Sequence, residues 1–415
     1  MNFRNFILYG LSVGLNRGIV FFLLPLAGYF LNKNDFGTFS LIIITSQLLI
    51  PILTINVSSV IAREFLDAKE MLNRYVGYIV ILLIGMTILS MLFGGKYKNV
   101  FCFIISESLL MVLITRARFF LGVNTYFVAT VLKAISFLLI FLIVFLLRHG
   151  FLYNVISFCI MLALSNYVAI LFVLSKDFFI NISYKVSLSN LHFFLQKDKK
   201  FIWFGILLIP HSLSQWVMSS SDRYIIKVFF NDTVLGEYSL AYAYASLFML
   251  FISVLAITLP EYCIRKYDSF CKKRMLLMFM STMALVYIFG FISLYVVVLQ
   301  YINFNVREIN IFCIIYSSLF YLVMYHYCSS FHFYHKRSKF ITKTTLLASL
   351  FSVLITLIFA WKGNIIGVSF CTYFSYFFYF LLIRRGVSTI NTNVVISVMM
   401  ISFIPLLIRC FHVIS

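Results

Sequence analysis

Long apolar stretches of about 20 residues follow one another along almost the whole chain, separated by short polar segments. About 20 residues of helix cross the roughly 30 Å of hydrocarbon in a bilayer. The hydrocarbon contains no water to bond backbone N–H and C=O groups, so these groups must bond one another. Helices are therefore expected rather than open sheets. The pattern predicts twelve spans, at 7–30, 37–61, 75–94, 99–120, 124–147, 152–174, 201–229, 236–260, 275–300, 308–331, 341–361 and 364–383.

The two halves of the chain repeat one another. "GTFSL" at 37–41 and "GEYSL" at 236–240 open the second and eighth spans, each after a short polar turn, where we expect glycine to permit a tight entry into the helix. Six spans per half give both halves the same orientation. We therefore expect an all-α polytopic membrane protein of two six-helix bundles, related by a pseudo-two-fold axis along the membrane normal.

The expected organisation is a first bundle at 1–174, a cytoplasmic linker at 175–200 and a second bundle at 201–385. An additional hydrophobic segment follows at 386–415. Its apolar core, 394–413, is either a thirteenth span or a helix docked on the bundle.

Charge fixes the orientation of the spans. The net charge is +20, which in a soluble protein would suggest nucleic acid, yet only 11% of the residues are charged. With the N-terminus in the cytoplasm, 22 of the 33 Lys and Arg fall in inner segments and 8 in outer ones. This follows the positive-inside rule, so the basic residues indicate topology and not a nucleic-acid partner.

No pattern in the chain proposes bond chemistry. There is no phosphate-binding Gly-rich loop and no outer segment long enough for a catalytic domain. The eight cysteines are scattered. Of His326, Cys328, His332 and His335, only the last three can share a helix face, at a span end. We expect no enzyme activity, no metal site and no cofactor; movement of a molecule across the bilayer remains.

Three charged residues lie deep in the predicted spans of the first half. Arg17 and Lys133 lie about 15 and 14 Å from the inner surface, and Glu107 about 12 Å from the outer one. Charges at such depths are unfavourable and often mark a pathway. One reading is a structural ion pair. The other is that Arg17 and Lys133 bind a transported anion and Glu107 carries a coupling ion.

The seventh span carries a second group of polar residues. His211, Gln215 and Asp222 follow helical spacing and can share one face, which makes them candidates for substrate contact and, for Asp222, ion coupling. Hydrogen bonding to neighbouring helices is the alternative. Adjacent residues point about 100° apart. We therefore expect Asp222 and Arg223 not to face the same neighbour, with Arg223 reaching the outer surface.

Three segments carry a resemblance to a known family: "DRYIIKVFFNDTVLGEYSLAYAYASL" at 222–247, "NKNDFGTFSLI" at 32–42 and "RARFFLGVNTYFVATVLKAISF" at 116–137. They resemble segments of Wzx-type polysaccharide flippases, which share a superfamily (MOP) with MATE multidrug exporters and the lipid II flippase MurJ. The first segment is the most specific, and the likeness covers most of the chain.

The resemblance implies alternating-access movement of an undecaprenyl-diphosphate-linked oligosaccharide to the periplasmic leaflet of a bacterial inner membrane, driven by an ion gradient. It also implies a cationic central cavity and, as further partners, a polysaccharide polymerase and a chain-length regulator. A drug or metabolite antiporter and a non-transporting scaffold of a polysaccharide assembly complex are the alternatives.

The first prediction is topological. Reporter fusions at residues 185 and 270 should read as cytoplasmic, and fusions at 97 and 232 as periplasmic. A periplasmic signal at 185 would overturn both the orientation and the repeat.

Overall fold

The computed structural model describes residues 23–65, 69–147, 154–180, 199–302, 304–387 and 389–414, with the single positions 12, 14, 15, 150 and 152. Arg17 and most of the predicted first span lie outside these residues.

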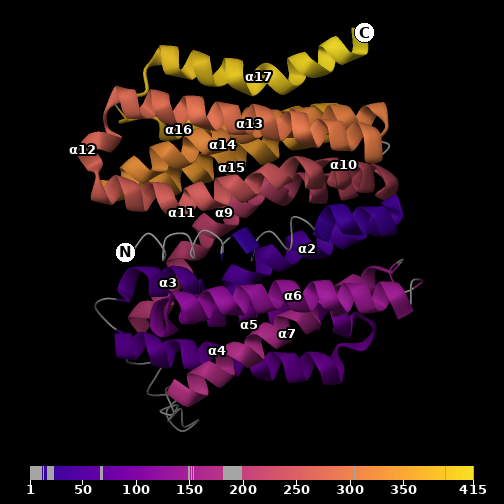
Figure 1. Cartoon of the computed structure of the whole chain (residues 1–415), viewed down its shortest axis with the longest axis vertical. Helices are drawn as coiled ribbons and strands as arrows, with labels where there is room; N and C mark the ends of the chain where they lie inside the picture. The colour runs from indigo at the N-terminus through magenta and orange to yellow at the C-terminus, as the bar shows by residue number, and fades with distance from the viewer. Residues whose placement is uncertain are drawn as a thin grey trace. The chain divides into compact units, whose positions relative to one another are not determined.

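Every regular element of the described residues is a helix (Figure 1). Beyond the helical stretch 23–30 they are α2 (Lys33–Leu53), α3 (Val57–Glu64), α4 (Lys69–Phe93), α5 (Lys98–Arg116), the π-helical η2 (Ala117–Leu121), α6 (Val123–Leu147), α7 (Val155–Ile180), α9 (Lys199–Phe229), α10 (Asp232–Ala245), α11 (Met249–Arg265), α12 (Tyr267–Phe270), α13 (Lys273–Tyr301), α14 (Val306–Tyr334), α15 (Ser338–Trp361), α16 (Ile365–Ile383) and α17 (Thr392–Ile414), with short 3-10 turns η1 (Gly95–Tyr97) and η5 (Ser246–Phe248).

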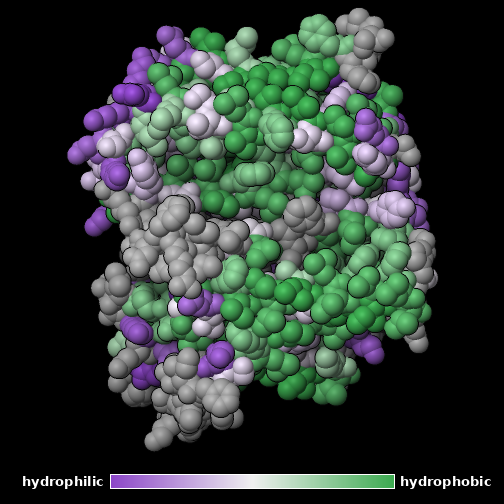
Figure 2. Space-filling view, in the orientation of Figure 1, coloured by the Kyte–Doolittle hydropathy of each residue, from purple (hydrophilic) through white to green (hydrophobic). Residues whose placement is uncertain are grey.

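Twelve helical stretches of the described residues are long and apolar enough to cross a membrane. They match the second to twelfth predicted spans and add α17, and so confirm an all-α polytopic membrane fold. On α6, side chains such as Leu138 and Leu146 are exposed, as expected of a lipid-facing helix. Figure 2 shows broad hydrophobic surfaces, with hydrophilic residues gathered toward the left and right margins.

The prediction of one continuous span over 37–61 is wrong at its end. The helix stops at Leu53 and restarts at Val57, because Ile55 and Asn56 take left-handed conformations with φ of 48° and 50°. A Cβ on Gly205 of α9 would overlap the carbonyl oxygen of Ile55, and Asn56 Nδ2 donates to Ser212 Oγ at 3.0 Å. Close contact with α9 thus accompanies a conformation that L-residues avoid.

The chain divides into two compact units. The first is Met1–Ile19 with Phe39–Leu213, and the second is Val20–Thr38 with Ser214–Ser415. Each unit has one central helix, α5 in the first and α14 in the second. Of the residues in their most apolar stretches, 78% and 89% are buried.

These two central helices are the fourth spans of the two sequence halves. In the first unit α5 packs on α4 and α7, and α7 packs on α6. In the second unit α14 packs on α13 and α16, and α16 packs on α15. The corresponding helices therefore contact one another in the same order, as a repeat requires, although α14 also packs on α10, α11 and α17.

α17 packs along α14 at the edge of the second unit (Figure 1). Near its middle, the hydroxyl of Ser402 donates to that of Tyr321 at 2.8 Å. Near its end, Arg409 Nε donates to Asn310 Oδ1 at 3.0 Å. The partners run from the middle of α14 to its start, so α17 is antiparallel to α14.

The repeated glycines serve a different purpose from the tight turn that we expected. Gly37 and Gly236 both lie inside helices, α2 and α10, whose first turns meet within the second unit. A Cβ on Gly236 would overlap the carbonyl oxygen of Lys33, and one on Gly37 would lie 3.2 Å from that of Asp232. Between them, Thr233 Oγ1 donates to Asn34 Oδ1 at 2.8 Å.

These residues correspond to one another in the repeat, since Lys33, Asn34 and Gly37 precede Asp232, Thr233 and Gly236 by one constant offset. Equivalent positions therefore contact each other, as they do only near an axis of local two-fold symmetry. Absence of a side chain at both glycines allows the two backbones to approach this closely.

The second prediction tests this contact. Gly236→Ala should destabilise the protein by about 1–3 kcal/mol, because the added methyl meets backbone that cannot move independently. Thermal unfolding in detergent measures the change. The matched control is Gly85→Ala in α4, where nothing lies within 4 Å of the added atom. Equal shifts for the two variants would contradict a specific close approach.

Candidate functional site

A buried polar cluster joins α5, α6 and α7 of the first unit. Lys133 of α6 is fully buried, and its Nζ lies 3.2 Å from both carboxylate oxygens of Glu107 on α5. Asn166 of α7 donates from Nδ2 to Glu107 Oε2 at 2.8 Å and to Ser106 Oγ at 3.1 Å. The structure thus brings together two of the charged residues that depth alone had matched.

The cluster is asymmetric in exposure. The side chain of Lys133 is 1% exposed and that of Glu107 is 21% exposed. The ammonium therefore depends on the carboxylate for charge compensation, while the carboxylate retains a route to solvent or an ion. Sequence reasoning missed Asn166 and Ser106, although an asparagine inside an apolar span was an available signal.

A second cluster joins α9 to α10 in the second unit. Tyr238 donates its hydroxyl to Asp222 Oδ2, and the backbone N–H of Arg223 donates to Asp222 Oδ1 at 2.8 Å. Thr372 of α16 lies 3.5 Å from the Tyr238 hydroxyl. Asp222 is 6% exposed, so these donors replace water around its carboxylate.

Arg223 contacts the same helix as Asp222, which corrects two expectations. Its guanidinium lies 4.0 Å from the ring centroid of Tyr242, one turn beyond Tyr238, and the residue is 5% exposed. It does not reach the surface. Asp222 and Arg223, adjacent on α9, instead contact α10 at positions one turn apart. The buried cation–π contact with Tyr242 stabilises the guanidinium of Arg223.

This arrangement gives a physical reason for the most specific sequence segment. Asp222 and Arg223 form its first part, Tyr238 and Tyr242 its last. The pairs Asp222–Tyr238 and Arg223–Tyr242 hold the helices on either side of the turn at 230–231. The segment encodes a polar contact between consecutive helices.

The remaining candidates of the seventh span lie on α9 but do not form one polar surface. His211 is half-buried, and its Nδ1 has no hydrogen-bond partner in the part of the chain that the structure describes. Gln215 is exposed, whereas Asp222 is buried. Arg17 lies outside the described residues.

Charged residues in the short loops predicted to be outside, and at the first positions of the spans that follow them, form a network that sequence reasoning missed. Lys33 Nζ lies 2.8 Å from Glu308 Oε1 and 3.4 Å from Glu237 Oε1. Arg307 Nη1 lies 3.3 Å from Glu237 Oε2, and Asn305 Nδ2 donates to Glu237 Oε1 at 3.1 Å. Asn305 and Glu308 form a capping box that starts α14. The network ties the starts of α2, α10 and α14 together.

The histidines near the end of α14 use separate partners. A ring nitrogen of His332, Nε2, lies 2.8 Å from the carbonyl oxygen of Ile383, and His335 Nε2 lies 2.7 Å from the hydroxyl of Tyr267. Among the described residues no group of three His, Cys, Asp or Glu is arranged to hold a metal ion.

The fold defines the class of protein. The chain is similar to the lipid II flippase MurJ in an inward closed conformation, at 14% identity and a TM-score of 0.60 over 98% of this chain and 92% of that one. It is also similar to an outward-facing multidrug resistance MATE family transporter of the MOP superfamily, at 14% identity and a TM-score of 0.59 over 98% and 94%. A MOP superfamily transporter from Pyrococcus furiosus is similar at 15% identity and a TM-score of 0.52, over 98% of this chain and 95% of that one. The chain is a multi-pass membrane protein with this shared fold.

The chain belongs to the polysaccharide biosynthesis protein family, whose sequence model matches residues 3–260. That match includes the buried cluster of the first unit and the contact between α9 and α10. No curated protein matches the chain significantly.

The third prediction concerns the contact between α9 and α10. Tyr238→Phe should cost about 1–3 kcal/mol of stability, because the buried Asp222 carboxylate loses its hydroxyl donor. Thermal unfolding of Tyr238→Phe, Asp222→Asn and the double variant measures their coupling. Tyr301→Phe is the control, since Tyr301 is 72% exposed. Additive effects of the two changes would show that the contact contributes nothing.

Proposed function

We propose that the chain is a flippase that moves an undecaprenyl-diphosphate-linked oligosaccharide repeat unit from the cytoplasmic to the periplasmic leaflet by alternating access. The match to the polysaccharide biosynthesis family over residues 3–260 carries this proposal. We assign the chain to the bacterial inner membrane, as the family resemblance implies, with its N-terminus in the cytoplasm, as the distribution of Lys and Arg favours. A polysaccharide polymerase and a chain-length regulator are its proposed partners.

The proposal assigns the diphosphate to Arg17 and Lys133. Among side-chain groups, guanidinium and ammonium bind phosphate oxygens most strongly. The attraction between the two charges is stronger where water is excluded. His211 and Gln215 are assigned to the hydrated sugar. In support, His211 Nδ1 has no hydrogen-bond partner among the described residues, and Gln215 is exposed.

The ion pair of the first unit could couple the binding of a proton to the binding of the substrate. While Glu107 is ionised, it holds Lys133 at 3.2 Å and Lys133 is not free for a phosphate. If a proton neutralises Glu107, the buried ammonium needs another anion, and the diphosphate provides one. Proton binding at Glu107 and substrate binding at Lys133 would then favour each other. Asp222 is buried, whereas the side chain of Glu107 is 21% exposed, so Asp222 is the weaker coupling candidate.

The fourth prediction tests the proposed function in cells. Loss of the chain should leave lipid-linked repeat units accumulated in the inner leaflet and stop glycan export. Arg17→Ala should do the same at normal abundance, and Arg17→Lys should restore part of the export, because charge survives but the bidentate fork does not. Full export by Arg17→Ala would remove Arg17 from the site. Normal export without the chain would refute a flippase.

The fifth prediction separates pairing from coupling at Glu107. Breaking the pair with Glu107→Gln or Lys133→Met should lower abundance, because one buried charge loses its partner at a cost of about 3–5 kcal/mol. The double variant should recover abundance. If the two residues only neutralise each other, and Lys133 does not bind the diphosphate, the double variant also recovers export.

If Glu107 instead carries a coupling proton, the double variant recovers abundance but not gradient-dependent export. The measurement is export of labelled lipid-linked glycan by membrane vesicles, with and without an imposed proton gradient. Unchanged, gradient-sensitive export by Glu107→Gln alone would contradict both roles.

A further inference from the structure

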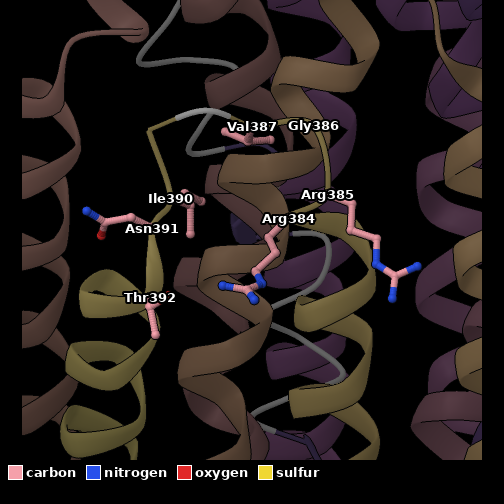
Figure 3. Close-up of a pocket in the computed structure, with 7 residues that line it drawn as sticks. All are labelled: Arg384, Arg385, Gly386, Val387, Ile390, Asn391 and Thr392. Atoms are coloured by element: carbon pink, nitrogen blue, oxygen red, sulfur yellow. The ribbon is translucent and has the colours of Figure 1, made fainter.

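An open hollow of about 480 Å³ lies at the turn between α16 and α17. It is lined by Arg384, Arg385, Gly386, Val387, Ile390, Asn391 and Thr392. In Figure 3 the side chain of Arg384 extends between the end of α16 and the start of α17, whereas Arg385 points to the other side of the turn. Val387 and Ile390 are buried and give the hollow an apolar floor.

Among the described residues, three arginines at this end of the second unit, Arg337, Arg384 and Arg385, form no ion pair with an acidic side chain. No Asp or Glu follows Glu308 in the sequence. Arg337 adds to the charge, since its Nη1 lies 3.1 Å from where a Cβ on Gly386 would be. No ion pair involves Arg337, Arg384 or Arg385 within the described residues, in contrast to Lys33 and Arg307 at the other end.

An apolar stripe leads away from the hollow along α17. Thr392 lines the hollow, and Ile396 and Met400 follow it one and two turns later on the same face. Ile396 is 54% exposed and Met400 65%. Phe403 and Leu407 continue the stripe and are also exposed. The opposite face of α17 is buried against α14, so this stripe is free for a ligand.

A basic hollow that is large enough for a lipid headgroup and continues into an exposed apolar stripe has the polarity of one amphiphile. Basic residues at the cytoplasmic ends of spans attract anionic headgroups, and basic pockets between spans bind them specifically. The acyl chains of a lipid held there would lie along α17.

We infer that this hollow binds the headgroup of an anionic phospholipid of the inner leaflet, with Arg384 as the main phosphate contact and α17 as the acyl-chain surface. The site shares no residue with the proposed substrate site. It depends on the inner position of the 384–392 turn but not on flippase activity.

The experiment measures phosphatidylglycerol binding to the purified full chain in detergent, against phosphatidylcholine, by native mass spectrometry in about 0.3 M salt, which screens exposed charges. Arg384→Gln should weaken binding at least about tenfold, as loss of a charge-assisted hydrogen bond does. Lys339→Gln, an exposed charge of the neighbouring inner segment, is the matched control and should change binding less than about threefold. Arg384→Lys tests the same contact with the charge kept, and should give an intermediate loss.

Equal losses for Arg384→Gln and Lys339→Gln would show diffuse surface attraction and overturn the site, as would no loss for Arg384→Gln. A parallel titration with undecaprenyl diphosphate separates the two sources of phosphate. If Arg384→Gln weakens only that ligand and leaves phosphatidylglycerol binding unchanged, the phospholipid assignment is wrong.

Discussion

A charge inside a membrane span has to find its counter-charge within the protein, because lipid offers none. The pair between Lys133 and Glu107 meets this constraint in the first unit, where Asn166 completes the bonding of the carboxylate. In the second unit hydrogen-bond donors stabilise the carboxylate of Asp222, and the ring of Tyr242 stabilises the guanidinium of Arg223. The positions of these four charged residues fix how α5, α6 and α7 pack, and how α9 meets α10.

The same constraint connects the fold to the proposed activity. An ion pair that holds a bundle together in one protonation state leaves a buried cation in the other, and a diphosphate can satisfy it. The network of Lys33, Arg307, Glu237 and Glu308 is compensated without a ligand, so it serves to hold helix ends. A buried cation such as Lys133 stabilises the fold while its partner is charged, and can bind an anionic substrate once that partner is neutralised.

The spans, the repeat and the match in depth between Glu107 and Lys133 could be predicted from sequence, because each depends on local hydropathy or on helical rise. The break at Ile55 could not, since it accompanies a close approach of Gly205 from a distant helix. The joint contact of Asp222 and Arg223 with α10 was missed because the prediction considered only the directions of the two side chains around the axis of α9. Long side chains can also reach along a neighbouring helix and contact it at two positions. The packing of α17 on α14 likewise depends on tertiary contacts.

The most direct test of this account is reconstitution of the purified chain into vesicles that carry fluorescent undecaprenyl-diphosphate oligosaccharide in both leaflets. A membrane-impermeant reagent that destroys the label reports which leaflet holds it. The account predicts that the chain makes the inner-leaflet label accessible, faster under an imposed ion gradient. Inner-leaflet label that stays protected in vesicles containing the folded chain, with or without a gradient, would contradict it.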